Sequence, residues 1–92
     1  MDLKMKIKRN GNSSFQIADG KAVVMLAVNS NIFTLNEIGT VIWGLLDAPK
    51  TIEDLADATQ KKFPEDNQET IREDILVFIK DCLKEQLLIQ ED

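Results

Sequence analysis

Short runs of alternating apolar and polar residues occupy the first third of the chain, which is the pattern of half-buried β-strands. A strand at 14–18 ends at Asp19-Gly20, a dipeptide typical of two-residue hairpin turns. The following run, 21–28, is apolar on both alternating sets of positions, as expected for a central strand whose two faces are both at least partly covered. These two runs predict an antiparallel hairpin.

A third strand is expected at 31–35, after a weaker turn at Asn29-Ser30, with Ile32 and Phe33 on opposite faces. The three strands then form an antiparallel meander in which the last strand is an edge. In a simple meander, one row of backbone N–H and C=O groups on this strand has no partner. The sequence thus predicts an open sheet edge at 31–35.

The segment LNEIGTVIWGLLD at 35–47 predicts a helix over 37–46. Asn36 is a favourable N-cap, and an apolar stripe follows it at helical spacing. Gly39 lies inside this helix, where glycine is unfavourable unless another group must approach the backbone closely. Trp43 lies beside the stripe, so it either caps a satellite of the core or serves a second contact surface.

Two further helices are expected after this one. Thr51 is the expected N-cap of a helix that ends at Phe63-Pro64, and the last helix runs from about 68 to 86. The apolar arc of the last helix covers about half of its circumference. Either part of this arc borders a groove, or the helix is buried against both the sheet and the other helices. Strands followed by helices predict an α+β fold with a winged-helix-like layout in which the sheet comes first.

The two ends of the chain carry weaker strand signals. Apolar and basic residues alternate near the start, at Leu3, Lys4, Met5, Lys6, Ile7 and Lys8. This alternation predicts either an edge strand protected from aggregation by charge or a basic arm for an acidic ligand. The apolar run Leu87–Ile89 suits a small strand. We expect one domain over residues 1–92, with 1–13 as an N-terminal strand or arm.

Composition narrows the range of functions. No apolar run approaches the roughly 18 residues of a membrane span, and the start of the chain lacks the apolar region of a signal peptide. The single cysteine, Cys82, suits a reducing compartment, so we expect a cytoplasmic protein without membrane association. The chain contains no histidine, which excludes metal sites of the His/Cys type and histidine-based acid–base catalysis.

Charge is divided unevenly along the chain. Residues 1–50 carry six Lys/Arg and four Asp/Glu, a net charge of +2, whereas residues 51–92 carry five and twelve, a net charge of −7. An acidic helical half is a poor partner for a polyanion, which argues against nucleic acid. A winged-helix-like DNA-binding or transcriptional adaptor protein is nevertheless the alternative that the layout leaves open.

Motifs of catalysis are missing from the sequence. There is no Gly-rich phosphate loop, no cysteine pair and no Ser–His–Asp set, and EDNQE at 65–69 lacks the ligand pattern of a calcium loop. The carboxylates of the predicted helices are interpreted as solvated faces. We therefore expect a protein that is not an enzyme and needs no cofactor or metal.

A binding mode follows from the predicted open edge. An extended peptide can add to the edge as a further strand, with main-chain hydrogen bonds for affinity and side-chain pockets for specificity. Ile32, Phe33 and Thr34 would then face the last helix. The flank used by that helix is either Val77, Phe78 and Asp81 or else Leu76 and Leu83. The same edge also suits homodimerisation, so a monomer or a weak homodimer is expected.

The chain resembles the PqqD-like proteins, the pyrroloquinoline-quinone biosynthesis protein D family, also called recognition elements of ribosomally made, modified peptides. The resemblance covers roughly residues 14–90. Its later part, TIEDLADATQKKF and KDCLKEQLLI, matches mainly as an apolar pattern. Its specific part is the run Leu35-Asn36-Glu37-x-Gly39-x-x-Ile42-Trp43-x-Leu45-Leu46.

The resemblance implies a three-stranded sheet packed on three helices, with the leader of a precursor peptide added as a fourth strand beside the third. It also implies a partner from natural-product biosynthesis, a modifying enzyme such as a radical-SAM enzyme or a leader peptidase. Carried over by position, the leader lies along Asn31–Leu35 and against the helix around Asp74–Asp81. The candidate peptide-binding residues are Asn31, Ile32, Phe33, Thr34, Leu35, Asp74, Val77, Phe78 and Asp81.

One segment departs from the family pattern. Val28–Phe33 (VNSNIF) lacks the Pro-Glu-Arg-like approach to the first helix that is usual in members of the quinone pathway. The form with Gly39 and Trp43 is more similar to stand-alone elements of lasso-type and related peptide clusters. The resemblance therefore implies leader binding as a class rather than assembly of pyrroloquinoline quinone.

Overall fold

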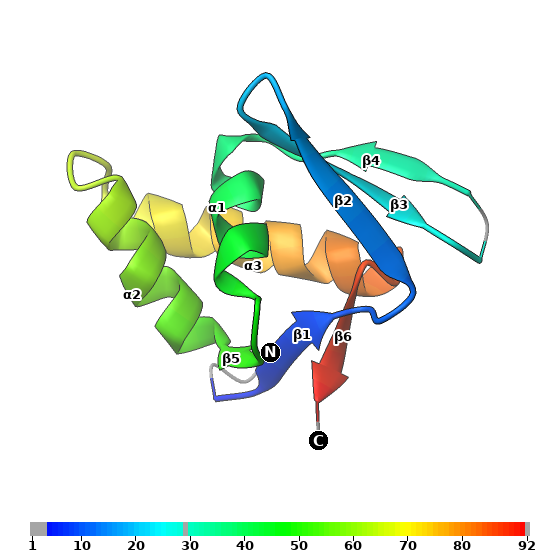
Figure 1. Ribbon diagram of the computed structural model, residues 1–92. Coiled ribbons are helices and arrows are strands. Elements are labelled where there is room, and N and C mark those ends of the chain that lie inside the picture. The colour runs from blue at the N-terminus through cyan, green and yellow to red at the C-terminus, as the bar shows by residue number, and fades with distance from the viewer. Residues whose placement is uncertain (1–3, 29, 92) are drawn as a thin grey trace.

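The computed structural model describes residues 4–28 and 30–91, and it has the predicted order of a meander followed by three helices (Figure 1). The antiparallel meander has β3 in its centre and consists of β2 (Ser13–Ala18), β3 (Lys21–Leu26) and β4 (Ile32–Thr34). The helices are α1 (Glu37–Leu45), α2 (Ile52–Lys62) and α3 (Gln68–Lys84). The α+β fold predicted from the sequence is confirmed.

A second small sheet joins distant parts of the chain. Its strands, in the order β5-β1-β6, are β5 (Lys50–Thr51), β1 (Lys6–Arg9) and β6 (Leu88–Glu91). The interpretation of the N-terminal alternation as an edge strand is wrong, because β1 pairs on both sides and buries Ile7 completely. The small strand expected at the end of the chain is present as β6. Leu3 and Asn29, which belong to the predicted arm and turn, lie outside the described residues.

Local signals explain where the elements begin. The Asn36 Oδ1 atom accepts from the Gly39 backbone N–H at 2.8 Å, which caps α1. The Thr51 hydroxyl accepts from the Asp54 N–H at 3.0 Å, which caps α2. Asp19 and Gly20 both have positive φ angles, of 54° and 78°, as a primed two-residue hairpin turn requires.

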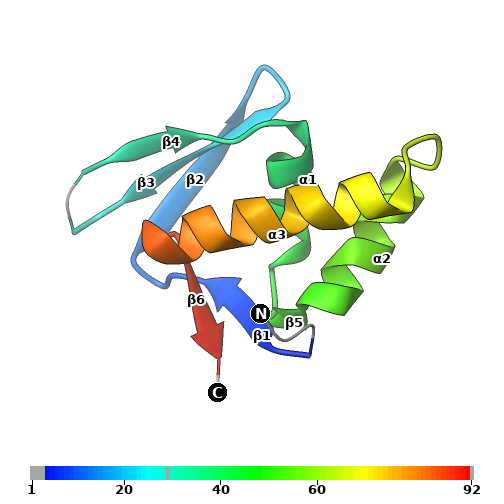
Figure 2. The same ribbon diagram turned by 180° about the vertical axis from the view of Figure 1, so that it is seen from behind.

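One hydrophobic core connects the meander to the helices. Along β3, Ala22, Val24 and Leu26 are buried and belong to this core, whereas Met25 on the other face is 43% exposed. β3 is therefore fully covered on one face only. Figure 2 shows α3 crossing the molecule in front of α1, with the meander toward one end and α2 at the other. The buried residues of α3 are Ile71, Ile75, Ile79 and Cys82.

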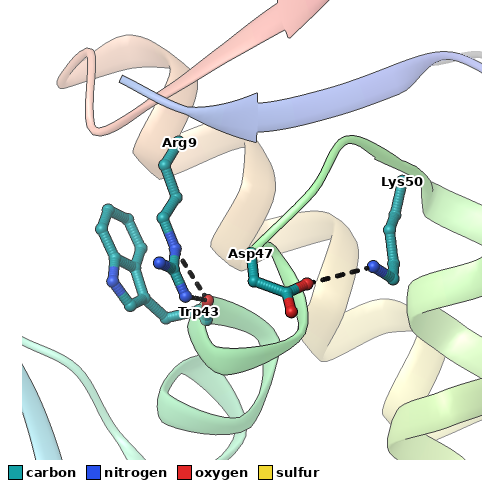
Figure 3. Close-up of polar contacts among 4 residues, drawn as sticks. All are labelled: Arg9, Trp43, Asp47 and Lys50. Carbon is teal, nitrogen blue, oxygen red and sulfur yellow. Dashed lines mark hydrogen bonds and ion pairs between the residues drawn. The ribbon is translucent and has the colours of Figure 1, made fainter. Parts of the chain in front are cut away.

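Trp43 belongs to the main core and is 1% exposed, so it is neither a satellite nor part of a surface. Its ring meets Phe15 edge-on, with ring centroids 5.9 Å apart. Arg9 stacks on both rings. It donates from Nε at 3.0 Å, and also from Nη2, to the Trp43 carbonyl (Figure 3). Burial lowers the pKa of Arg9, and the Asp47 carboxylate opposes this shift. The cluster thus ties the small sheet and β2 to the end of α1.

Candidate functional site

β4 is an edge strand, as predicted, because it pairs with β3 alone in the order β2-β3-β4. Hydrogen bonds at its two ends define its orientation. The Asn31 carbonyl accepts from the Leu26 N–H at 3.1 Å, and the Leu35 N–H donates to the Ala22 carbonyl at 2.8 Å. These residues therefore direct their backbone groups toward β3.

The directions in which the three β4 residues point their backbone groups follow from the alternation along an antiparallel strand. In an antiparallel ladder the backbone groups of successive residues point to opposite sides. The backbone groups of Phe33, which pairs with Val24, accordingly point toward β3. Ile32 and Thr34 direct their N–H and C=O groups away from the sheet. Within residues 4–28 and 30–91 no strand lies on that side to accept them. The open edge thus presents the backbone groups of two residues.

Two hollows lie along α3, one between α3 and the β4 edge and the other between α3 and the start of α1, and together we call them the β4–α3 groove. The first has a volume of about 420 Å³ and is lined by Asn31, Ile32, Phe33, Asp81, Lys84 and Glu85. The second has a volume of about 270 Å³ and is lined by Asn36, Ile38, Asp74, Val77, Phe78 and Asp81. Asp81 lines both hollows, so they adjoin at this residue of α3.

A close contact between α1 and α3 shapes the wall of the groove. A Cβ atom placed on Gly39 would lie 2.7 Å from Phe78 Cε1, closer than such atoms can approach. The ring of Phe78 therefore packs directly on the α1 backbone at Gly39. This contact explains the glycine that the sequence made conspicuous, and it fixes α3 against the first turn of α1.

Seven of the nine predicted residues line the β4–α3 groove: Asn31, Ile32, Phe33, Asp74, Val77, Phe78 and Asp81. Leu35 does not, because it is 5% exposed and belongs to the core. Thr34 lines neither hollow but lies on the open edge.

The structure also decides between the two flanks of α3. Val77, Phe78 and Asp81 line the groove, whereas Leu76 and Leu83 pack against the core and line neither hollow. The groove therefore uses the flank of Val77, Phe78 and Asp81.

Four residues of the groove were not predicted: Asn36, Ile38, Lys84 and Glu85. Asn36 and Ile38 were interpreted only as a helix cap and a core position. Lys84 and Glu85 lie one turn beyond Asp81, and continuing the helical spacing from Asp81 would have found them.

The chemistry of the groove is that of a binding surface. Its apolar side chains come from both β4 and α3, and its charged groups are solvent-exposed. On the buried side of α3, burial raises the pKa of the Cys82 thiol to about 12, with a further contribution from Asp81. No group of three or more Cys, Asp and Glu residues arranged to hold a metal ion occurs in the described part of the chain.

Comparison with known proteins identifies the family of this chain. The family model described as coenzyme PQQ synthesis protein D (PqqD) matches residues 22–88. The chain belongs to the PqqD family. The match spans the meander from β3 onward, the three helices and the start of β6, and so includes the whole β4–α3 groove.

A solved structure resembles this PqqD-family chain over most of its length. The two share a TM-score of 0.78 and 23% sequence identity, covering 88% of this chain and 93% of the other. That structure is described as TbiB1 in complex with the TbiA(beta) leader peptide. No curated protein sequence matches the chain. In the described part of this PqqD-family protein, no helix is long and apolar enough to cross a membrane.

Proposed function

We propose that this protein is a non-catalytic peptide-binding protein. It recognises the leader of a ribosomally synthesised, post-translationally modified precursor by strand addition to β4, and it presents the precursor to a modifying enzyme. A radical-SAM enzyme or a leader peptidase fits that role. The observation that carries the proposal is the open edge at Ile32 and Thr34 beside the β4–α3 groove.

Three features support strand addition over a different mode of binding. The unpaired backbone groups of β4 offer hydrogen bonds to any sequence, as strand addition requires. Phe33, which lies on the helix side of β4, and Val77, which is 60% exposed, offer apolar contacts on the two walls. Finally, the fold is shared with TbiB1, whose structure contains a leader peptide.

The DNA-binding alternative gains no support from the exposed surface of α3. Asp74 and Asp81 lie on its open side, where a recognition helix would need neutral or basic groups against the phosphates. A DNA-retention assay at low salt tests this directly, because DNA-binding proteins show strong salt-dependent retention. We expect no retention.

The main test titrates the precursor peptide encoded nearest to the gene into isotopically labelled protein. The backbone amide signals of residues 31–35 and 74–83 should shift, because the peptide covers both walls of the groove. Shifts confined to other parts of the protein would contradict the proposed site. Size exclusion at several protein concentrations should show whether the free protein is a monomer or a weak homodimer.

A proline substitution on each edge of the meander separates strand addition from side-chain binding alone. Thr34→Pro removes an outward N–H from β4. Ile17→Pro is the matched control, because the bond from Ala27 N–H to the Asn12 carbonyl makes the Ile17 N–H point outward from β2. Phe33→Pro is unsuitable, since its N–H faces β3.

Thr34→Pro should lower peptide affinity by about tenfold, the upper range for one lost hydrogen bond, while Ile17→Pro should leave it unchanged. Thermal unfolding of both variants controls for loss of the fold. Equal peptide affinity in the two variants would contradict strand addition.

A further inference from the structure

The β4–α3 groove carries a net negative charge. Three carboxylates line it, from Asp74, Asp81 and Glu85, against the single ammonium group of Lys84. Within the described residues no ion pair is found at Asp74, Asp81 or Glu85, whereas Lys50 pairs with Asp47. A peptide that enters the groove therefore meets more carboxylates than ammonium groups.

The carboxylates have a definite arrangement around the apolar part of the wall. Asp74 and Asp81 are two turns apart on α3, about 10.5 Å along its axis, with Val77 and Phe78 between them. Side chains on one face of a strand repeat about every 6.7 Å. A strand seated against Val77 and Phe78 therefore places its next same-face residues, two positions before and after, within reach of Asp81 and Asp74.

The opposite face of the meander has different chemistry. Its hollow, of about 260 Å³, is lined by Ser14, Phe15, Gln16, Val23, Met25 and Ile32, none of which is charged. Alternate residues of an added strand would point to this side. The protein is therefore expected to discriminate between charged side chains only at the alternate peptide positions that face the β4–α3 groove.

We infer that the peptide accepted by β4 carries an apolar side chain that faces Val77 and Phe78 and a lysine or arginine two positions away on the same face. This inference rests on the function proposed above and specifies the ligand of that site. An acidic residue at the flanking position would face Asp81 or Asp74 and be repelled. An arginine there can also stack on the rings of Phe33 or Phe78.

Selection from displayed random twelve-residue peptides tests the inference without knowledge of the natural precursor. Peptides are selected on the wild-type protein after removal of those that bind Thr34→Pro equally well. Enriched sequences should contain Lys or Arg two positions from an apolar residue more often than one position from it. Selected peptides are then synthesised and their affinities measured.

Each synthesised peptide should bind about fivefold more weakly to the one of Asp81→Asn and Asp74→Asn that lacks the carboxylate facing its basic residue, because that substitution removes the charge pair. Glu73→Gln is the matched control, since Glu73 is exposed on α3 but lines neither hollow of the groove. Added salt should weaken binding to the wild type and have less effect on the double variant Asp74→Asn/Asp81→Asn.

The outcomes separate this inference from the proposed function. Enrichment of neutral or acidic peptides, with unchanged affinity for the Asp81→Asn and Asp74→Asn variants, would overturn the charge rule and leave strand addition in place. If no peptide remains after removal of those that bind Thr34→Pro equally well, strand addition itself fails, and the charge rule fails with it.

Discussion

β1 and β4 are both short strands, of four and three residues, but they hold opposite positions in their sheets. β1 lies between β5 and β6 and pairs on both sides, and its Ile7 is completely buried. β4 pairs on one side only, and its Ile32 is 66% exposed. In Figure 1 the two strands lie apart, β1 at the bottom of the view and β4 at the upper right.

This difference assigns the two strands different roles: β1 contributes to the stability of the fold, and β4 to peptide binding. The small sheet uses the backbone groups of β1 to hold the two ends of the chain together. The meander leaves the outer backbone groups of β4 unpaired beside a groove. Substitutions near β1 are therefore expected to change the free energy of unfolding, and substitutions near β4 are expected to change peptide affinity.

The largest effect is expected from a matched pair of isoleucine substitutions. Ile7→Ala should lower the free energy of unfolding by about 2–5 kcal/mol, because it leaves a cavity in the core. Ile32→Ala should change it by less than about 0.5 kcal/mol and should weaken peptide binding instead. Urea denaturation measures the first quantity and a peptide titration the second. Similar losses of stability in both variants would remove the distinction between the two strands.

A smaller effect is expected from the two glycines of α1. Gly39→Ala should lower the free energy of unfolding by about 1 kcal/mol, because overpacking against Phe78 exceeds the gain in helix propensity. Gly44→Ala should raise it by about 0.5–1 kcal/mol, since no atom lies within 4 Å of the added Cβ. Gly39→Ala should also weaken peptide binding by displacing Phe78.

Denaturation of the two glycine variants under identical conditions gives this comparison. Stabilisation by Gly39→Ala equal to that by Gly44→Ala would show that Phe78 does not press on α1, and that the groove wall is not fixed there.

An effect that appears only at high pH concerns the boundary between the two regions, at Cys82 on α3. Its carbonyl accepts from the Leu87 N–H at 2.9 Å, next to β6, while the neighbouring Asp81 lines the groove. Burial raises the pKa of Cys82 from 9.0 to about 12 in the folded state. The native state therefore retains a proton that the unfolded state loses, and stability should fall as pH rises from 9 toward 12.

The slope from this group is at most about 1.4 kcal/mol per pH unit. Denaturation of the wild type and of Cys82→Ala between about pH 8 and 10 measures it, and the variant should show the flatter dependence. Parallel curves would mean that the buried thiol does not titrate differently in the two states.

Features set by neighbouring residues were predictable from the sequence. The caps at Asn36 and Thr51 and the turn at Asp19-Gly20 each depend on contacts over a few positions, and all three are present. The open edge at β4 was predictable as well, because the order of strands in a meander follows from its turns.

Features that depend on residues far apart in the chain could not be predicted from the sequence. β1 was interpreted as an edge because its partners lie far along the chain, and β5 has only two residues, too few for any periodicity. The flank of α3 that lines the groove depends on how the helix is rotated against the sheet. The contact between Gly39 and Phe78, which joins two helices, helps to fix that rotation.

The brevity of β4 has a kinetic consequence. Ile32 and Thr34 offer four outward backbone groups in all, and each hydrogen bond contributes a net of only about 0.5–1.5 kcal/mol. A peptide held by so few backbone hydrogen bonds dissociates readily, since differences in affinity act mainly through the dissociation rate. Rapid turnover of this kind would let one copy of the protein serve many precursor molecules in succession.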